Sequence, residues 1–193
     1  MKSTLWNIPN ILTILRVVFA VGIFVLLPFQ FYAVCIVFFL LAAATDYFDG
    51  YLARKYNLIT VFGRIMDPFA DKLLICGCFI YLCAIEELRI PWGIHPWMAV
   101  VIFGREMLIT SLRAFVEKGG GDFSAKWIGK WKMGLQCVAV PACLLFLLLP
   151  ESFCVKSLML ISLWGTVLIT VYSGIVYIGN AVRAINGYPK FDS

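Results

Sequence analysis

Long apolar runs separated by short polar segments make up most of this chain. Six runs have about 20 residues each, the length that crosses the hydrocarbon core of a bilayer as an α-helix. Hydrophobic residues make up 62% of the 193 residues and charged residues 14%, whereas charged residues form roughly 25% of an average soluble domain. We therefore predict an all-α integral membrane protein with six transmembrane helices in a single domain, residues 1–193. The six predicted spans are Ile11–Phe29, Phe31–Ala53, Ile65–Ile85, Ile94–Phe115, Trp131–Leu149 and Phe153–Ile178.

Basic residues are concentrated at one end of the predicted bundle. They flank the connection between the second and third spans, crowd the connection between the fourth and fifth, and mark both chain ends. On the opposite side the only lysine or arginine residues are Arg89 and Lys156, beside three glutamates. The positive-inside rule then places both termini in the cytoplasm, and we expect the membrane to be a bacterial inner membrane. The segment Thr4–Pro9, which contains Trp6, is predicted to lie at the membrane surface before the first span.

Four aspartates interrupt the apolar pattern where the second span ends and the third begins. Asp46 and Asp49 are three residues apart and Asp67 and Asp71 are four apart, so each pair shares one face of a helix. Buried carboxylates are costly unless cations compensate them, and we predict that these four hold two Mg²⁺ or Mn²⁺ ions roughly 3.5–4 Å apart. The alternative to a metal site is that the four acids only extend toward the water at the membrane interface. Because Pro68 favours a first helical turn, we expect the third helix to begin just before Asp67.

Small residues and one arginine accompany the acids. Gly50 and Ala53 fall on the same helical face as the first aspartate pair, which leaves room for a ligand near the backbone. Arg54 can form two parallel hydrogen bonds to a phosphate, and Gly63 lies one helical turn before the second pair. These features favour a phosphate-bearing ligand, and close helix packing through small residues is the alternative.

The complete pattern from Asp46 to Asp71 resembles the signature of the CDP-alcohol phosphotransferases. It reads Asp-x-x-Asp-Gly-x-x-Ala-Arg, eight residues, Gly, three residues, Asp, three residues, Asp, and every fixed position and gap of that signature is present. The resemblance implies a six-helix membrane domain that forms homodimers, two metal ions held by the four aspartates, and Asp71 as the general base. It also implies a CDP-linked donor, attack by an alcohol on its β-phosphate, and release of CMP. The residues that the resemblance assigns to the donor site are Asn10, Thr13, Gly50, Ala53, Arg54, Thr60 and Gly63.

Three further segments indicate which alcohol is the acceptor. Asn7–Arg16, Gly104–Arg113 and Ala125–Lys132 resemble the corresponding stretches of phosphatidylglycerophosphate synthases, which use CDP-diacylglycerol and glycerol 3-phosphate. Four cations in the last two segments suit an acceptor that carries its own phosphate, since unpaired cations in a span are costly; membrane anchoring is the alternative for the lysines. Met133, directly after the third segment, departs from the threonine typical of that subfamily. In the first segment, Asn10 also fits the N-cap of the first helix. The predicted acceptor-site residues are Arg105, Arg113, Lys130 and Lys132.

Two other interpretations stay open at this point. The same family includes enzymes with other acceptors, such as cardiolipin synthases, phosphatidylinositol phosphate synthases and enzymes that use serine. A divalent-metal carrier lined by the aspartates is more distant, because the acids stop at one face of the predicted bundle. The seven cysteines and His95 lack the spacing of a metal site, and Gly119–Gly121 reads as a turn, with phosphate binding as its alternative. We expect no nucleic-acid partner.

Overall fold

The structure, a computed structural model, describes residues 7–55, 60–118 and 126–186; within these ranges it leaves out the side chains of residues 8, 47–55, 61, 64, 115–118, 126–130 and 183–186. The described part of the chain contains six α-helices, two single-turn 3₁₀ helices and no strand, which confirms the prediction of an all-α protein. The elements are α1 (Ile8–Leu26), η1 (Leu27–Phe29), α2 (Tyr32–Lys55), α3 (Val61–Ala84), η2 (Glu86–Leu88), α4 (Pro96–Lys118), α5 (Lys126–Leu148) and α6 (Phe153–Asn186).

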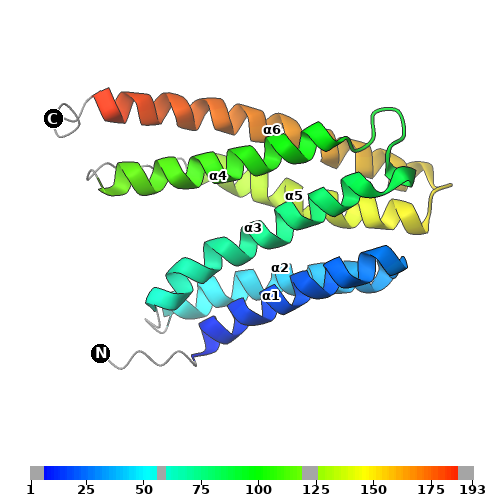
Figure 1. Cartoon of the computed structure of the whole chain (residues 1–193), viewed down its shortest axis with the longest axis horizontal. Helices are drawn as coiled ribbons and strands as arrows, with labels where there is room; N and C mark the ends of the chain where they lie inside the picture. Colours follow the sequence, from blue (N-terminus) through cyan, green and yellow to red (C-terminus); the bar gives the residue numbers. More distant parts are fainter. Residues whose placement is uncertain (1–6, 56–59, 119–125, 187–193) are drawn as a thin grey trace.

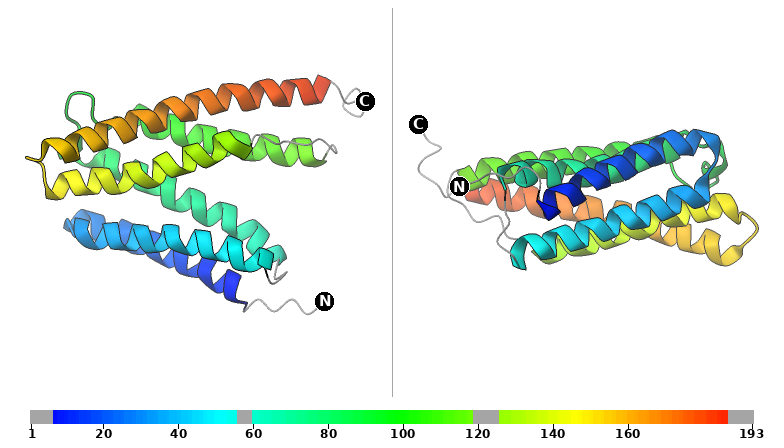
Figure 2. Two further views of the ribbon diagram at one scale, coloured as in Figure 1. Left: turned by 180° about the vertical axis from the view of Figure 1, so that it is seen from behind. Right: turned by 90° about the horizontal axis from the view of Figure 1, so that it is seen from below.

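The helices form an elongated bundle whose successive members run in opposite directions (Figure 1). α1 packs on α2 and α3, α5 packs on α2 and α6, and α4 packs on α3 and α6. α3 runs obliquely between the α1–α2 pair and the group formed by α4, α5 and α6, as the view from behind also shows (Figure 2). The ends of α2, α4 and α6 therefore lie at the same end of the bundle as the starts of α1, α3 and α5. We call this the aspartate end, because Asp46 and Asp67 belong to it.

The start of α1 differs from the sequence prediction. The N-cap of this helix is Asn7, whose side chain accepts a hydrogen bond from the backbone N–H of Asn10 at 3.0 Å. The N-cap role predicted for Asn10 was therefore wrong. Asn10 lies in the first turn of the helix and is buried, so its side chain faces the protein.

The start of α3 also differs, because a threonine upstream of the aspartates caps the helix. The Thr60 side chain accepts a hydrogen bond from the backbone N–H of Gly63 at 3.0 Å, which satisfies one of the free donors at a helix start. The helix begins at Val61, so the prediction that it begins just before Asp67 was wrong. Pro68 lies inside α3, where it removes one backbone hydrogen bond.

Three segments of the described chain are long and apolar enough to cross a membrane, namely Pro9–Phe29, Trp131–Leu148 and Phe153–Val182. α2 contains a shorter apolar stretch, Tyr32–Asp46. Acidic and basic residues occupy the first half of α3 and lie from the middle of α4 onward, which lowers the apolar character of both helices. The structure thus supports an integral membrane protein. The prediction of six spans with cytoplasmic termini remains a prediction.

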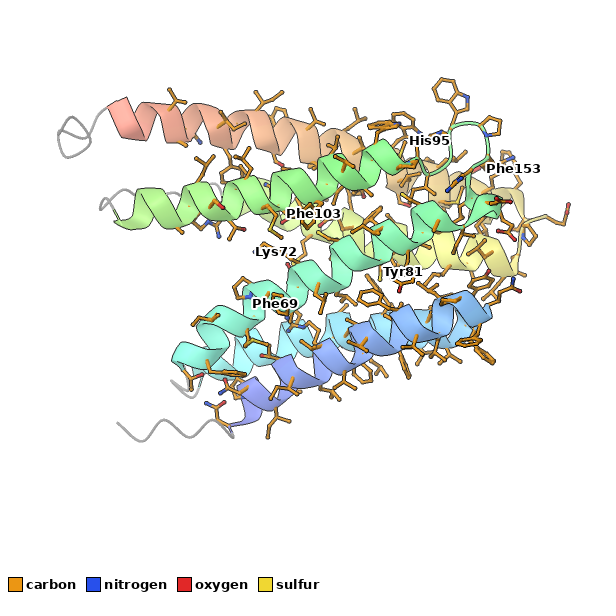
Figure 3. All side chains as sticks on the ribbon, viewed as in Figure 1. Phe69, Lys72, Tyr81, His95, Phe103 and Phe153 are labelled. Carbon is orange, nitrogen blue, oxygen red and sulfur yellow. The ribbon has the colours of Figure 1, made fainter. Side chains whose placement is uncertain are left out.

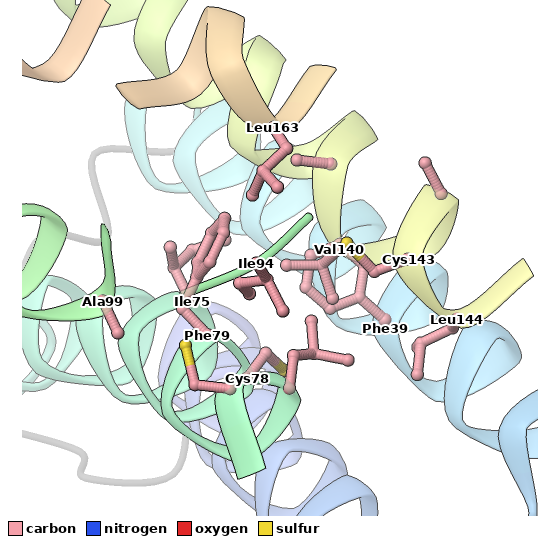
Figure 4. Close-up of a cluster of buried hydrophobic side chains, with 14 of the residues drawn as sticks. Phe39, Ile75, Cys78, Phe79, Ile94, Ala99, Val140, Cys143, Leu144 and Leu163 are labelled. Atoms are coloured by element: carbon pink, nitrogen blue, oxygen red, sulfur yellow. The ribbon is translucent and has the colours of Figure 1, made fainter. Parts of the chain in front are cut away.

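A buried apolar core joins all six helices. Figure 4 shows Phe39 of α2, Phe79 of α3 and Val140 of α5 in this cluster. Four of the seven cysteines belong to the cluster, and all seven are free thiols. The cysteines of the core thus pack as small hydrophobic residues.

Substitution of Gly77 should destabilise the bundle, because α1 and α3 approach each other closely there. A Cβ at this position would lie 2.2 Å from Cζ of Phe24, whose ring stacks on that of Tyr81 with centroids 5.3 Å apart. We expect Gly77→Ala to lower the midpoint of thermal unfolding in detergent, although alanine favours a helix over glycine by about 1 kcal/mol. In Gly179→Ala, the matched control in α6, the added Cβ would meet no described atom within 4 Å, so the midpoint should stay or rise. A rise for both variants would contradict the close packing.

Candidate active site

Polar side chains of α1 and α3 form a hydrogen-bonded cluster at the aspartate end. Oγ1 of Thr60 donates to Oδ1 of Asn10 at 2.8 Å, and Oγ1 of Thr13 donates to Oδ1 of Asp67 at 2.6 Å. A Cβ at Gly63 would lie only 3.0 Å from Oδ1 of Asn10, so the glycine leaves room for the cluster. The structure therefore brings four of the predicted donor-site residues together beside one predicted metal ligand.

Arg16, one turn after Thr13 in α1, contacts an aspartate of the neighbouring helix. Nη1 of Arg16 lies 2.8 Å from Oδ1 of Asp46, and the Arg16 side chain is only 1% exposed. A buried guanidinium needs a compensating anion, so this ion pair fixes the end of α2 against α1. No role of its own was predicted for Arg16 from the sequence. The signal that could have identified it is an arginine inside an apolar span, at helical spacing from Thr13.

Asp71 lies among charged side chains from four helices. Its carboxylate interacts electrostatically with Asp46 of α2, Lys132 of α5, Arg16 of α1 and Lys72 of α3. The predicted general base thus lies close to one predicted metal ligand, Asp46, and to one predicted acceptor-site cation, Lys132. This juxtaposition is the central feature of the site.

The described carboxylates suit a hard divalent cation in their chemistry. Asp46 of α2 and Asp67 of α3 present oxygen donors from two helices that both pack on α1. Each is held by a residue of α1, as metal ligands commonly are by neighbouring groups. The side chain of Asp49 is outside the described set. Among the side chains that are described, no three His, Cys, Asp or Glu residues form a group that could hold a metal ion. The four-aspartate metal site stays a prediction.

A polar cavity of about 570 Å³ opens between α3 and α4 beside Asp71. Arg105 and Arg113 line it, as two of the predicted acceptor-site residues, together with Glu106 and Lys72. Figure 3 shows Lys72 in the space between α3 and α4. Lys72 was not among the site residues predicted from the sequence, although a cation directly after the predicted base was a usable signal. The cavity can therefore accommodate an anionic ligand next to Asp71.

Lys132 reaches the same region from α5. The residue as a whole is 7% exposed. Its side chain pairs with the carboxylate of Glu106 and interacts electrostatically with Arg105, Asp71 and Lys72. Cations of α3, α4 and α5 thus gather around the base. The alternative, that Lys132 only anchors the protein at the membrane surface, would require an exposed side chain instead.

Several sequence predictions fall on parts of the chain that the structure does not describe. They are most of the segment Thr4–Pro9, the run Gly119–Gly121, and the side-chain positions Asp49, Gly50, Ala53, Arg54 and Lys130. His95 is described and lies in the loop directly before α4, at the opposite end of the bundle from the aspartates (Figure 3).

The fold and the site define a helical membrane protein with a carboxylate and cation site at one end of its bundle. The chain belongs to the CDP-alcohol phosphatidyltransferase family, whose model matches residues 6–172. Among its relatives, a protein named probable phosphatidylglycerophosphate synthase from Mycobacterium tuberculosis (strain H37Rv) is 36% identical over 193 residues, which cover 96% of this chain and 87% of the relative. The CDP-diacylglycerol–glycerol-3-phosphate 3-phosphatidyltransferase of Bacillus subtilis (strain 168) is 39% identical over 152 residues, 77% of this chain and 74% of the relative.

The comparisons confirm the family resemblance that the signature predicted. A third relative, the protein of the same name from Yersinia enterocolitica, is 39% identical over 136 residues, 67% of this chain and 72% of the relative. Membership of this family identifies a transferase, so the metal-carrier interpretation is set aside. Which alcohol is the acceptor must be inferred from the charged side chains of the site.

Proposed function

We propose that this protein transfers the phosphatidyl group of CDP-diacylglycerol to glycerol 3-phosphate and releases CMP. The observation that carries the proposal is the position of Asp71, which lines one cavity together with Arg105, Arg113 and Lys72 and lies close to Asp46 of the family signature. Lys72, Arg105 and Arg113 outnumber the acids of the lining, Asp71 and Glu106, so the cavity carries an excess of positive charge. An acceptor with its own phosphate compensates this excess, and a neutral acceptor does not. The names of the relatives from three bacteria support the same reaction.

In this mechanism the chain's own residues bind the acceptor and move one proton. Arg105, Arg113, Lys130 and Lys132 hold the phosphate of glycerol 3-phosphate, and Asp71 takes the proton from its 1-hydroxyl. The oxygen forms a bond to the β-phosphorus of the donor while the bond from that phosphorus to the CMP oxygen breaks. Divalent ions, Mg²⁺ or Mn²⁺, would be held by Asp46, Asp49, Asp67 and Asp71 and would neutralise charge on the diphosphate.

The donor site lies on the α1 side of the same end. Oxygen-bearing side chains of α1 and the α3 start surround Gly63 there, which supports a ligand that approaches the backbone closely. The residues that we assign to CDP-diacylglycerol are Asn10, Thr13, Gly50, Ala53, Arg54, Thr60 and Gly63.

We further propose a single catalytic domain with six spans in a bacterial inner membrane, with both termini and the active site facing the cytoplasm, and a homodimeric assembly. The meeting of the ends of α2, α4 and α6 with the starts of α1, α3 and α5 supports the common orientation of the termini and the site. The basic residues of these ends support the cytoplasmic side.

The proposal is tested by incubating the purified protein in detergent with CDP-diacylglycerol, Mg²⁺ or Mn²⁺ and one acceptor at a time, with CMP release as the readout. Glycerol 3-phosphate should be used far better than glycerol, serine, inositol phosphate or phosphatidylglycerol. Faster CMP release with any of the other acceptors would contradict the proposed acceptor but not the family.

Thr13→Val should weaken the binding of Mn²⁺, because it removes the hydroxyl that donates to Asp67 at 2.6 Å and leaves a side chain of similar shape. Loss of such a supporting hydrogen bond lowers metal affinity by about 10- to 100-fold. Electron paramagnetic resonance of free Mn²⁺ measures the affinity without any turnover. Thr13→Ser keeps the hydroxyl and is the matched control. Equal affinities for the valine and serine variants would contradict the metal role of Asp67.

A further inference from the structure

Glu106 is an acid in the middle of the cation cluster, and the proposed function gives it no role. We propose that Glu106 is the positioning residue of the acceptor-phosphate site. Its carboxylate holds Arg105 of its own helix and Lys132 of α5 at the same oxygen atom. Side chains of α6 hold Arg105 from the other side. This inference rests on the proposed function, because it concerns the cations that bind the acceptor's phosphate.

One oxygen of Glu106 serves both cations. Oε1 of Glu106 pairs with Nζ of Lys132 and lies 3.4 Å from Nη1 of Arg105. The three side chains are nearly buried, with exposed fractions of 11% for Glu106 and Arg105 and 9% for Lys132. Arg105 and Lys132 are close enough to repel each other. The shared acid offsets that repulsion and sets the spacing between the two cations.

Two residues of α6 hold Arg105 from the other side. The Ser173 hydroxyl donates to the backbone carbonyl of Thr170 at 3.0 Å, so its oxygen is oriented to accept from Nε of Arg105 at 3.1 Å. The guanidinium carbon of Arg105 lies 5.3 Å from the centroid of the Tyr177 ring, a cation–π contact. Ser173 and Tyr177 are both buried. Arg105 is therefore held by side chains of α4 and α6 in the protein without acceptor.

This arrangement predicts how phosphate binding responds to the charge of Glu106. Glu106 lines the polar cavity together with Arg105 and Arg113, so a phosphate that enters meets cations already in place and pays less for ordering them. Removal of the charge on Glu106 would let Arg105 and Lys132 move apart, and phosphate binding would weaken although the cavity becomes more positive. If net charge alone governed the cavity, the same change would tighten phosphate binding.

The test compares Glu106→Gln with wild type and with Glu151→Gln, an exposed acid in the turn between α5 and α6 at the opposite end of the bundle. Three constants are measured from CMP release: the KM for glycerol 3-phosphate, the KM for CDP-diacylglycerol, and the inhibition constant of inorganic phosphate against glycerol 3-phosphate. In Glu106→Gln we expect the first and third constants to rise about tenfold, the effect of losing one charge-assisted contact. The donor KM should change by less than about twofold, since α1 and the start of α3 hold the donor. Glu151→Gln should match wild type in all three.

The possible outcomes separate this inference from the proposed function. Unchanged or tighter phosphate inhibition in Glu106→Gln, or an equal rise of both KM values, would overturn the positioning role. Absence of CMP release by the wild-type protein with glycerol 3-phosphate would overturn the proposed function itself.

A second pair of variants covers the case in which Glu106→Gln does not fold. Tyr177→Phe keeps the aromatic face beneath Arg105, and Tyr177→Leu removes it. A cation–π contact of this kind corresponds to about three- to tenfold in affinity, so the leucine variant should raise the KM for glycerol 3-phosphate by about that factor relative to the phenylalanine variant. Equal constants for the two variants would overturn the part of the inference that concerns α6.

Discussion

Asp71→Asn is expected to lower the rate of CMP release by about 10²- to 10⁴-fold, the contribution of a general base. Asparagine has nearly the same shape as aspartate, so the contacts of α3 with its neighbours remain. The amide cannot take the proton from the acceptor hydroxyl. CMP release at saturating CDP-diacylglycerol and glycerol 3-phosphate measures the effect, and the thermal unfolding midpoint checks that the fold is intact.

The control for Asp71→Asn is Glu86→Gln, the same change from acid to amide at an exposed position in η2, at the opposite end of the bundle. It should release CMP at the wild-type rate. If Asp71→Asn also retained more than about a third of the wild-type rate, well outside the range for a general base, the assignment of the base would be wrong. The carboxylate of Asp71 would then act as a metal ligand or as a structural charge and not as the base.

Arg113→Gln is expected to raise the KM for glycerol 3-phosphate about tenfold or more, because a hydrogen bond to a charged group contributes roughly 1.5–3 kcal/mol. Arg113 lines the polar cavity and is exposed, so its replacement leaves no buried charge without a partner. The KM for CDP-diacylglycerol should stay near its wild-type value. Steady-state CMP release with each substrate varied in turn measures both constants.

Lys156→Gln removes an exposed charge near the start of α6, far from the cavity, and serves as the control for Arg113→Gln. If both variants raised the KM for glycerol 3-phosphate equally, the effect would be one of overall charge rather than of a phosphate site. If Arg113→Gln raised the KM for the donor instead, Arg113 would belong to the CDP-diacylglycerol site.

The boundaries of the helices illustrate where local sequence signals compete. Asn7 and Asn10 are both good N-cap residues, and only the structure shows that Asn7 takes this role and leaves Asn10 to accept from Thr60. Pro68 suggested a helix start, but Thr60 caps α3 two turns earlier and the helix continues through the proline. A single local preference of about 1 kcal/mol does not decide such boundaries, because packing of the whole helix contributes more.

The sequence by itself determined the all-α membrane class, the family and the reaction type. These follow from features that are local along the chain: apolar runs of bilayer length, and aspartates, glycines and an arginine at fixed helical spacing. The tertiary structure alone decided that Arg16 pairs with Asp46 and that Glu106 joins Arg105 to Lys132. The partners in two of these contacts are about 30 residues apart in the chain. No spacing rule connects such positions, because the packing of separate helices sets which buried charges meet and compensate one another.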